Sequence, residues 1–187
     1  MADYTSIQGP DLFDRQLNNR NFLSPAGFRF TLTKAPKVDF FSKSVSIPNL
    51  TLGAAIQTNY LRDIPVPGDK LVYGDLDIDF FIDENLDNYL EIERWMRALG
   101  YPESLEEAVD LNPENTTLLG SARSDGSILV YNSSFNAIAK ITFKDLFPVS
   151  LTPVPFSADV TDINYIVATA TFKYTIFNVE SLLKNES

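Results

Sequence analysis

The sequence predicts a mainly β protein, a β-sandwich or partly closed barrel with one α-helix on its flank. Three observations predict this fold. Polar and apolar side chains alternate near both ends of the chain, as they do in strands with one buried face. One central segment, about residues 85–99, has the three-and-four spacing of an amphipathic helix. The 11 prolines and 8 glycines supply the turns that many strands require. A strand-rich core with a helix packed beside it fits these patterns best.

The first part of the chain, residues 1–23, is polar and irregular, and we predict that it is an N-terminal arm. A flexible tail is the alternative. In this hypothesis the arm becomes ordered on a neighbouring subunit, because the segment contains more apolar residues than a solvent-exposed tail usually does. These inter-subunit candidates are Leu12, Phe13, Leu17, Phe22 and Leu23. Residues 24–187 then form a single domain, since no linker or repeat divides them.

Three strands are expected before the central segment. Residues 28–34, FRFTLTK, alternate in polarity and predict the first strand, which Pro36 interrupts. A second strand is expected over residues 41–47, ending before Pro48. A third, weaker pattern covers residues 54–61.

The next segment predicts a turn followed by a strand. In residues 63–69, DIPVPGD, the prolines cannot donate backbone hydrogen bonds and Gly-Asp permits a reversal. From Lys70 onward the side chains alternate. The apolar set is Leu76, Ile78 and Phe80, and the acidic set is Asp75, Asp77 and Asp79. Because burying unpaired charge is costly, the acidic face must meet water or a wet cavity.

The predicted helix over about residues 85–99 carries signals at both ends. Asp83 or Asn85 can serve as its N-cap, and Gly100 suits the position just after its last turn. Trp95 lies at the flank of the apolar stripe. The stripe itself contains Tyr89, Ile92, Met96 and Leu99.

The chain after the helix predicts an acidic loop or insertion and then a hairpin. The loop covers residues 101–126, and Asp125-Gly126 marks a reversal at its end. Strands are expected over residues 127–131 and 137–144, with the hairpin loop at 132–134.

The C-terminal part predicts a proline-punctuated connection and one long final strand. The strand is expected from Tyr165 to Val179. Its apolar face contains Ile166, Ala168, Ala170, Phe172, Tyr174 and Ile176. The opposite face is rich in threonine. Long exposed strand edges invite pairing with other chains, so this edge is a candidate for joining subunits.

Composition excludes several functions. The net charge of −10 and the isoelectric point of about 4.4 disfavour direct nucleic-acid binding, because the surface repels phosphates. The chain has no cysteine and no histidine, which removes disulfides, thiolate chemistry and histidine-based catalytic or metal sites. We therefore expect neither an enzyme nor a cofactor. The first residues lack the features of a signal peptide, and no stretch approaches the roughly 18 apolar residues of a membrane span.

The acidic face has three interpretations. Carboxylates can bind calcium, and a carboxylate pair can serve a glycosidase. Their spacing does not match a calcium-binding loop of the helix-loop-helix kind. Acids at every second residue of a strand are most often a solvated face, and we favour that interpretation. No catalytic, cofactor-binding or metal residue is assigned.

Three segments resemble the tail tube proteins of contractile-tailed bacteriophages, which share their fold with type VI secretion tube proteins. The segments are RNFLSPAGFRFTLTKAP, residues 63–99 and residues 128–177. They resemble an arm with a first strand, a Gly-Asp turn with strand and helix, and a C-terminal hairpin with a last long strand. Phe147, where the family pattern carries Trp before Pro, and the insertion at 101–126 depart from the pattern.

The resemblance implies a structural virion protein that forms hexameric rings, which stack into the inner tail tube. DNA passes through the lumen without specific binding, and the tail sheath, tape-measure and baseplate proteins are partners. It implies a location in the phage tail, after assembly in the host cytoplasm. Asp75, Asp77 and Asp79 are then candidates for the lumen or a wet interface. The alternatives are a tube-initiating or capping ring of the baseplate, or a monomeric β-sandwich module that binds carbohydrate or calcium.

Overall fold

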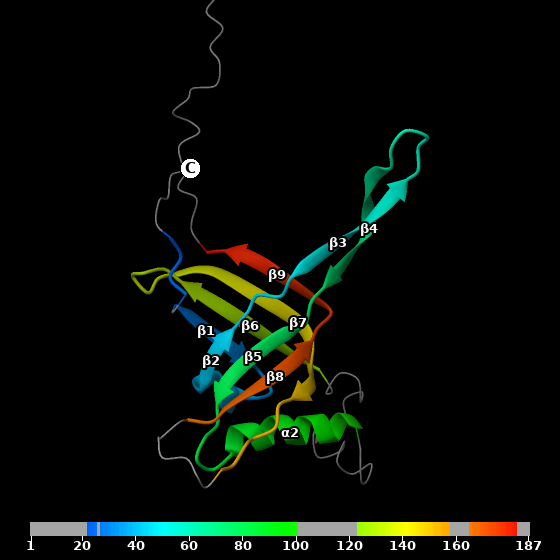
Figure 1. The fold of residues 1–187 in the computed structure, drawn as a ribbon. Helices are drawn as coiled ribbons and strands as arrows, with labels where there is room; N and C mark the ends of the chain where they lie inside the picture. The colour runs from blue at the N-terminus through cyan, green and yellow to red at the C-terminus, as the bar shows by residue number, and fades with distance from the viewer. Residues whose placement is uncertain (1–21, 26, 101–122, 158–164, 183–187) are drawn as a thin grey trace, which may run out of the picture.

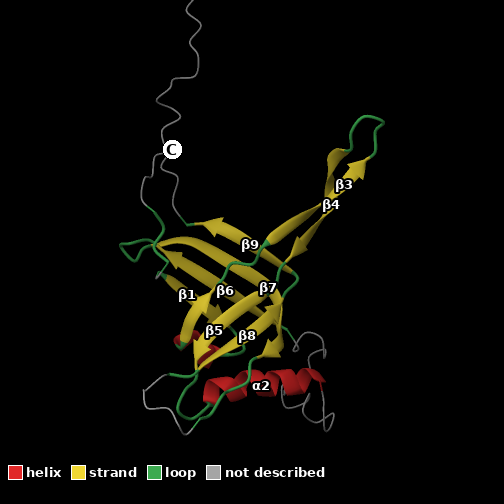
Figure 2. Ribbon diagram, in the orientation of Figure 1, coloured by secondary structure: helices red, strands yellow, loops and turns green. Residues whose placement is uncertain are grey.

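The structure is a computed structural model that describes residues 22–25, 27–100, 123–157 and 165–182. Within these ranges the chain is mainly β, as the sequence predicts, with nine strands and two helices (Figures 1 and 2). The strands form a seven-stranded sheet, which is not closed into a barrel, and a separate two-stranded hairpin. None of the described helices is both long and apolar enough to cross a membrane.

One layer of the body is built on the first half of strand β7 (Ala137–Leu151). Strand β1 (Phe28–Leu32) pairs with β6 (Ser124–Tyr131), and β6 pairs with β7. On its other side, the first half of β7 pairs with β9 (Ile176–Ser181). All these pairings are antiparallel.

The second layer continues from the other half of β7. Its C-terminal half pairs with β8 (Val167–Lys173), which pairs with β5 (Leu76–Phe81), and β5 pairs with β2 (Ser42–Val45). Asp145 lies between the two halves of β7 and has a φ of 58°. This left-handed residue marks the place where β7 passes from one layer to the other.

The core lies between the two layers and is made by alternate residues of their strands. Phe30, Phe80, Phe143 and Phe172 are among its largest fully buried side chains. The alternating sets predicted for β1, β5 and β8 therefore do face the core, except that Phe28 is only half-buried. The acidic residues of β5 lie on the opposite face.

Helix α2 (Asp87–Gly100) packs at one end of the sandwich, as Figure 1 shows. Ile92 and Trp95 are buried, and the Trp95 ring lies 6.1 Å from that of Phe172. The prediction that Trp95 lies at the flank is wrong, because the buried stripe runs through it. Tyr89, Met96 and Leu99 are partly buried against the core.

The predicted helix ends are also corrected. The helix begins at Asp87, directly after Leu86, whose carbonyl accepts a hydrogen bond from Leu90 N–H at 2.9 Å. Neither Asp83 nor Asn85 is therefore its N-cap. Gly100 is the last helical residue and does not follow the helix. Buried Asn88 fixes the entry instead, because its Nδ2 donates to the Phe81 carbonyl at 2.8 Å and its Oδ1 accepts from Asp83 N–H at 3.2 Å.

A short helix that the sequence analysis missed, α1 (Pro36–Phe40), follows β1. Proline is favoured at the first helical position, because its missing N–H has no intrahelical partner there. Asp39 ties the helix to β1 by accepting a hydrogen bond from Leu32 N–H at 2.8 Å. The second predicted strand is correspondingly shorter, since β2 omits Phe41 and Ile47, which are both exposed.

The separate hairpin consists of β3 (Leu50–Gln57) and β4 (Ile64–Tyr73), and it projects from the body (Figure 1). The turn predicted at residues 63–69 is wrong, because β4 runs through residues 64–69 and the reversal lies at 58–63. Pro65 pairs with Ile56 and Pro67 with Ala54. Two-stranded ribbons have free outer edges, where proline removes no ladder hydrogen bond.

Three further predictions are corrected. Asp125-Gly126 lies inside β6 and is not a reversal, and β7 extends through the predicted connection as far as Leu151. The predicted long last strand is divided into β8 and β9 between Lys173 and Ile176. The division shifts the alternation by one residue, so Phe177 is buried and Ile176 is exposed. Residues 1–21 of the arm and 101–122 of the acidic insertion lie outside the described residues.

Candidate assembly surfaces

The β3–β4 hairpin exposes apolar side chains on both of its faces. Tyr60 and Leu61 at its tip are 99% and 90% exposed. The exposed apolar residues along its strands are Leu50, Leu52, Ile56, Ile64, Val66, Leu71 and Val72. An isolated two-stranded hairpin is marginally stable in water, and apolar surface of this extent marks an interaction site.

The base of the hairpin is fixed to the body. Gly74 N–H donates to the Asn49 carbonyl at 2.9 Å, and Tyr174 Oη donates to the Gly74 carbonyl at 2.9 Å. The Tyr73 ring packs edge-on against Tyr174 and Phe177, with centroids 6.0 and 5.6 Å apart. The direction in which the hairpin projects is therefore set by packing at its base.

The two strands of the hairpin approach each other closely at a pair of glycines. A Cβ atom on Gly68 would lie 2.4 Å from the Gly53 carbonyl oxygen, so no other residue fits there without a backbone shift. The pairing register also shifts between Leu52 and Ala54. The glycine pair accommodates this irregularity.

The acidic face of β5 lies against threonines and a lysine of β8. Asp77 accepts a hydrogen bond from Thr171 Oγ1 at 2.7 Å. Asp75 forms an ion pair with Lys173 at 3.2 Å. These are cross-strand partners on the face opposite the core, and Asp75 and Asp77 are exposed to solvent.

Asp79 is the most enclosed of the three acids. Its carboxylate accepts hydrogen bonds from Ser44 Oγ at 2.5 Å and from Thr169 Oγ1 at 2.7 Å. These two bonds lower the pKa of Asp79 from its usual value. In the part of the chain that the structure describes, no three acidic residues gather in a way that could hold a metal ion. Each of the three acids instead forms its hydrogen bonds or ion pair with residues of neighbouring strands.

An apolar groove that the sequence analysis did not predict lies where β5 meets the chain before β2. It has a volume of about 570 Å³. Phe41, Phe81, Ile82 and Tyr165 form its wall, with the rings of Phe81 and Tyr165 in edge-on contact at 6.2 Å, and Asp83 and Glu84 complete the lining. One sequence signal was available, because Phe81 continues the acidic face of β5 with an aromatic residue.

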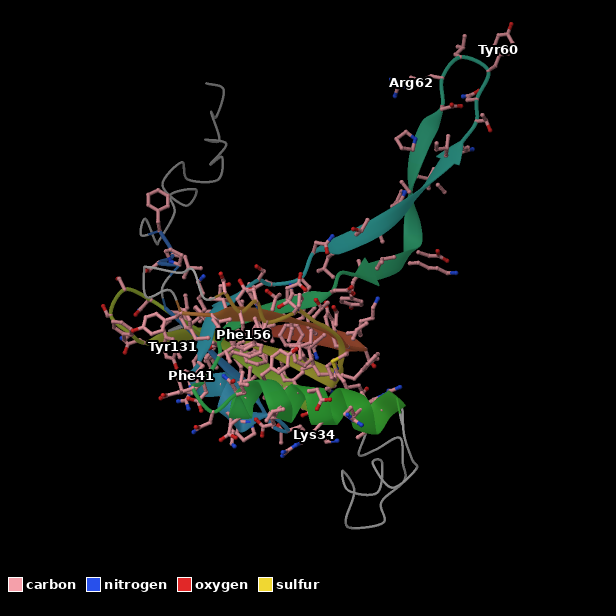
Figure 3. The ribbon with its side chains drawn as sticks, turned by 60° about the horizontal axis from the view of Figure 1, so that its bottom comes forward. Lys34, Phe41, Tyr60, Arg62, Tyr131 and Phe156 are labelled. Carbon is pink, nitrogen blue, oxygen red and sulfur yellow. The ribbon has the colours of Figure 1, made fainter. Side chains whose placement is uncertain are left out.

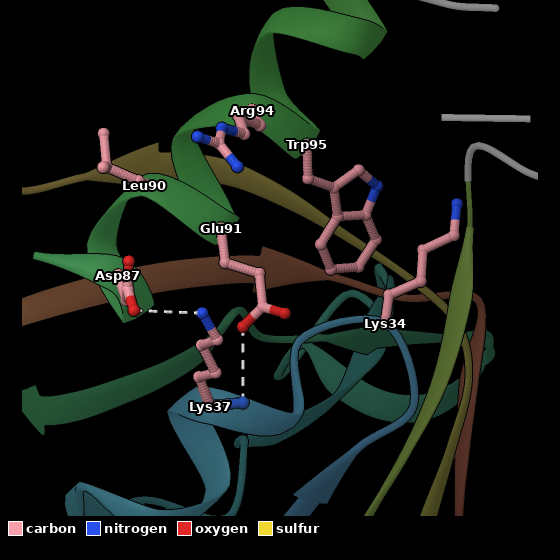
Figure 4. Close-up of a pocket in the computed structure, with 7 residues that line it drawn as sticks. All are labelled: Lys34, Lys37, Asp87, Leu90, Glu91, Arg94 and Trp95. Carbon is pink, nitrogen blue, oxygen red and sulfur yellow. Dashed lines mark hydrogen bonds and ion pairs between the residues drawn. The ribbon is translucent and has the colours of Figure 1, made fainter. Parts of the chain in front are cut away.

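A second, smaller pocket of about 330 Å³ lies between α1 and α2 (Figure 4). Lys37 joins the two helices: its Nζ pairs with Asp87 at 3.2 Å and its backbone N–H donates to Glu91 at 3.3 Å. Burial raises the pKa of Glu91, and this Lys37 N–H opposes the shift. Lys34 Nζ lies 5.6 Å from the centre of the Trp95 ring, and burial lowers the pKa of Lys34. The Lys37 contacts join α1 to α2, whereas Lys34 lies just before α1 and its buried Nζ has no hydrogen-bond partner among the described residues.

The predicted arm is described only at its end. Phe22 is 98% exposed and Leu23 is also exposed, while Leu12, Phe13 and Leu17 lie outside the described residues. None of the described body residues therefore covers Phe22.

No protein-family profile and no curated protein matches the sequence, but solved structures match the fold. A chain in the tube-terminating cap of the anti-feeding prophage matches with a TM-score of 0.58 at 14% identity, covering 91% of this chain and 99% of that one. A chain in the sheath–tube complex of the PVC extracellular contractile injection system matches with a TM-score of 0.57 at 13% identity, covering 87% and 94%. A chain in the anti-feeding prophage baseplate matches with a TM-score of 0.56 at 13% identity, covering 82% and 90%.

These likenesses define the class of fold. The protein has the fold of tail tube-like components of contractile systems, as the sequence resemblance implied. At this level of identity the likeness shows the fold alone.

Proposed function

We propose that this chain is a non-enzymatic structural subunit of a contractile tail or injection machine, which assembles into hexameric rings that stack into an inner tube. The observation that carries the proposal is the β3–β4 hairpin, whose apolar residues are exposed on both faces although its base is rigidly anchored. A hairpin of this kind needs a second chain to cover it. Tube-like proteins share the fold, which supports assembly with copies of itself.

The edges of the sheet offer a second means of association. In the described part of the chain, β1 pairs only with β6, and β2 pairs only with β5. Each leaves a row of backbone groups that a neighbouring chain can bind by adding a strand. Phe22 and Leu23 of the arm lie close to β1 in the sequence, so the arm is a candidate for covering a neighbour.

The acidic face fits a lumen or a wet interface between subunits. With Asp75, Asp77 and Asp79 turned away from the core, a net charge of −10 lets DNA slide past without binding. In this proposal the sheath, tape-measure and baseplate proteins are the partners, and the protein is part of a phage tail assembled in the host cytoplasm. An outer solvated face is the alternative for the same three residues.

A tube-initiating or capping ring of a baseplate is a second candidate, because the solved structures with this fold include a cap and a baseplate as well as a tube complex. Both candidates require self-association. A monomeric carbohydrate-binding or calcium-binding module is a third candidate. In that case nothing would cover the exposed apolar surface of the hairpin.

Light scattering after size exclusion, with negative-stain microscopy of the same fractions, tests the proposal on the full chain. We expect concentration-dependent self-association and rings or tubes. The variant Ile56→Asp should reduce the association, because it places a charge on the hairpin surface that would be buried. The matched control is Phe135→Asp in the β6–β7 loop, which places the same charge at an apolar residue that is 80% exposed, against 69% for Ile56, and whose φ of 58° aspartate tolerates. A chain that stays monomeric at high concentration would contradict the proposal.

A further inference from the structure

The tip of the β3–β4 hairpin combines apolar, aromatic and charged groups. Tyr60 and Leu61 are almost fully exposed, and Arg62 follows them. Tyr60 N–H donates a hydrogen bond to Oδ1 of the adjacent Asn59 at 2.8 Å. Among the described residues, no ion pair involves Arg62. Asp63, also exposed, follows Arg62, so the tip presents one cation and one anion beside two uncovered apolar side chains.

The groove formed by Phe41, Phe81, Ile82, Tyr165, Asp83 and Glu84 has the complementary chemistry. Its wall is aromatic and aliphatic, and its two carboxylates carry negative charge. The Lys43 ammonium lies 5.8 Å from the centre of the Phe81 ring, so a cation stands beside the groove as well. Its volume of about 570 Å³ lies within the usual range of binding pockets. We name it the Phe41–Tyr165 groove.

The tip of a chain is distant from its own groove. Figure 3 shows Tyr60 and Arg62 at the far end of the hairpin and Phe41 on the body. The hairpin is fixed at its base by the Gly74 and Tyr174 hydrogen bonds, so it does not fold back. Only a second copy can bring a tip to this groove.

We propose that the hairpin tip of one copy docks into the Phe41–Tyr165 groove of the next copy. Tyr60 and Leu61 pack on the aromatic wall, and Arg62 pairs with Glu84 and Asp83. This inference rests on the proposed function and identifies the surface through which copies of the chain meet. Because the contact joins two different surfaces, it repeats from copy to copy and builds a ring or a stack.

Cysteine cross-linking tests the contact directly, since the natural chain has no cysteine. Leu61→Cys and Phe41→Cys are prepared as separate proteins, mixed and mildly oxidised. A cross-link that needs both variants can only join two copies. We expect a covalent dimer in this mixture, at several times the yield of either variant alone. The matched control replaces Phe41→Cys by Ser133→Cys, on the exposed β6–β7 loop, and should give no more dimer than the single variants.

A charge exchange tests the pairing without depending on oxidation. Arg62→Glu and Glu84→Arg should each weaken self-association about 10-fold, because each places like charges together. The double variant, in which the signs are exchanged, should return to within about 3-fold of the natural chain. Both positions are exposed in the free chain, so unchanged thermal unfolding verifies that each variant is folded.

The outcomes separate this contact from the proposed function. If the natural chain assembles but the mixture gives no specific cross-link and the charge exchange gives no rescue, the contact is wrong and the assembly role stands. If the natural chain does not assemble, both are overturned. A specific cross-link together with rescue establishes the contact.

Discussion

The sandwich body and the β3–β4 hairpin are both rich in apolar residues but place them differently with respect to solvent. In the body, Leu76, Ile78 and Phe80 of β5 are completely buried. In the hairpin, which directly precedes β5, every strand residue is exposed or only half-buried. The body buries its apolar residues within one chain, whereas the hairpin leaves them exposed. Burial in the free chain thus separates residues that stabilise the fold from residues that are available for the association proposed above.

The largest expected effect comes from the substitution Leu76→Ala. Leu76 is 0% exposed, so the variant should lose about 2–5 kcal/mol of unfolding free energy through lost burial and a cavity. Denaturant unfolding of the monomeric chain measures the loss. The control is Leu52→Ala in the hairpin, at a residue that is 51% exposed, where we expect a change of about 0.5 kcal/mol. Equal losses would mean that the hairpin is packed in the free chain, and the comparison would fail.

The next effect concerns the buried amide that fixes the start of α2. Asn88→Ala removes the donor to the Phe81 carbonyl and the acceptor of Asp83 N–H, and should cost about 1–3 kcal/mol. Thermal unfolding measures it. Asn85→Ala, three residues earlier and exposed, is the matched control and should change stability little. A loss as large in the control would show that the loop as a whole, rather than Asn88, sets the helix start.

The third prediction concerns acid. The pKa of Asp79 is lowered in the folded chain by hydrogen bonds from Ser44 and Thr169, so its ionised form favours folding. This stabilisation is present above the unfolded-state pKa and is lost as the pH falls through the lowered folded-state pKa. In the Asp79→Asn variant, the unfolding temperature should therefore fall less steeply as the pH is lowered. Thermal unfolding measured between about pH 2 and 6 tests this. Asp69→Asn on the hairpin is the control, and equal flattening there would exclude a specific role for Asp79.

The smallest effect is expected at the exposed ion pair of the acidic face. Lys173→Ala breaks the pair with Asp75 and should cost about 0–1 kcal/mol, because both side chains are about half exposed. A double-mutant cycle with Asp75→Ala measures the pair, and about 1 M salt should remove the coupling. A coupling several times larger that persists in salt would mean that the face is shielded from solvent.

The sequence predicted helices and strands correctly where one face of the element is buried by the same chain. The alternation in β1, β5 and β8 and the stripe through Ile92 of α2 each follow from that condition, so the mainly β fold could be predicted. The hairpin could not be predicted, because Pro65, Pro67 and Gly68 are typical of turns. Only the three-dimensional arrangement reveals that β4 has a free edge where proline is tolerated.

Other features depended on information that is not local. The alternation from Val167 to Ile176 continues through Tyr174, so nothing in the pattern showed that one strand ends and another begins. The Phe41–Tyr165 groove joins residues from three distant parts of the chain. Whether Asp75, Asp77 and Asp79 face a lumen stays a prediction, since it depends on the position of neighbouring copies.

Strand β7 has a mechanical consequence. It is hydrogen-bonded to β6 and β9 in one layer and to β8 in the other. Sliding the layers past each other, or prising them apart, would require rupture of one of these rows of bonds along a single continuous backbone. A load applied to one layer is therefore transmitted to the other through the covalent backbone of β7.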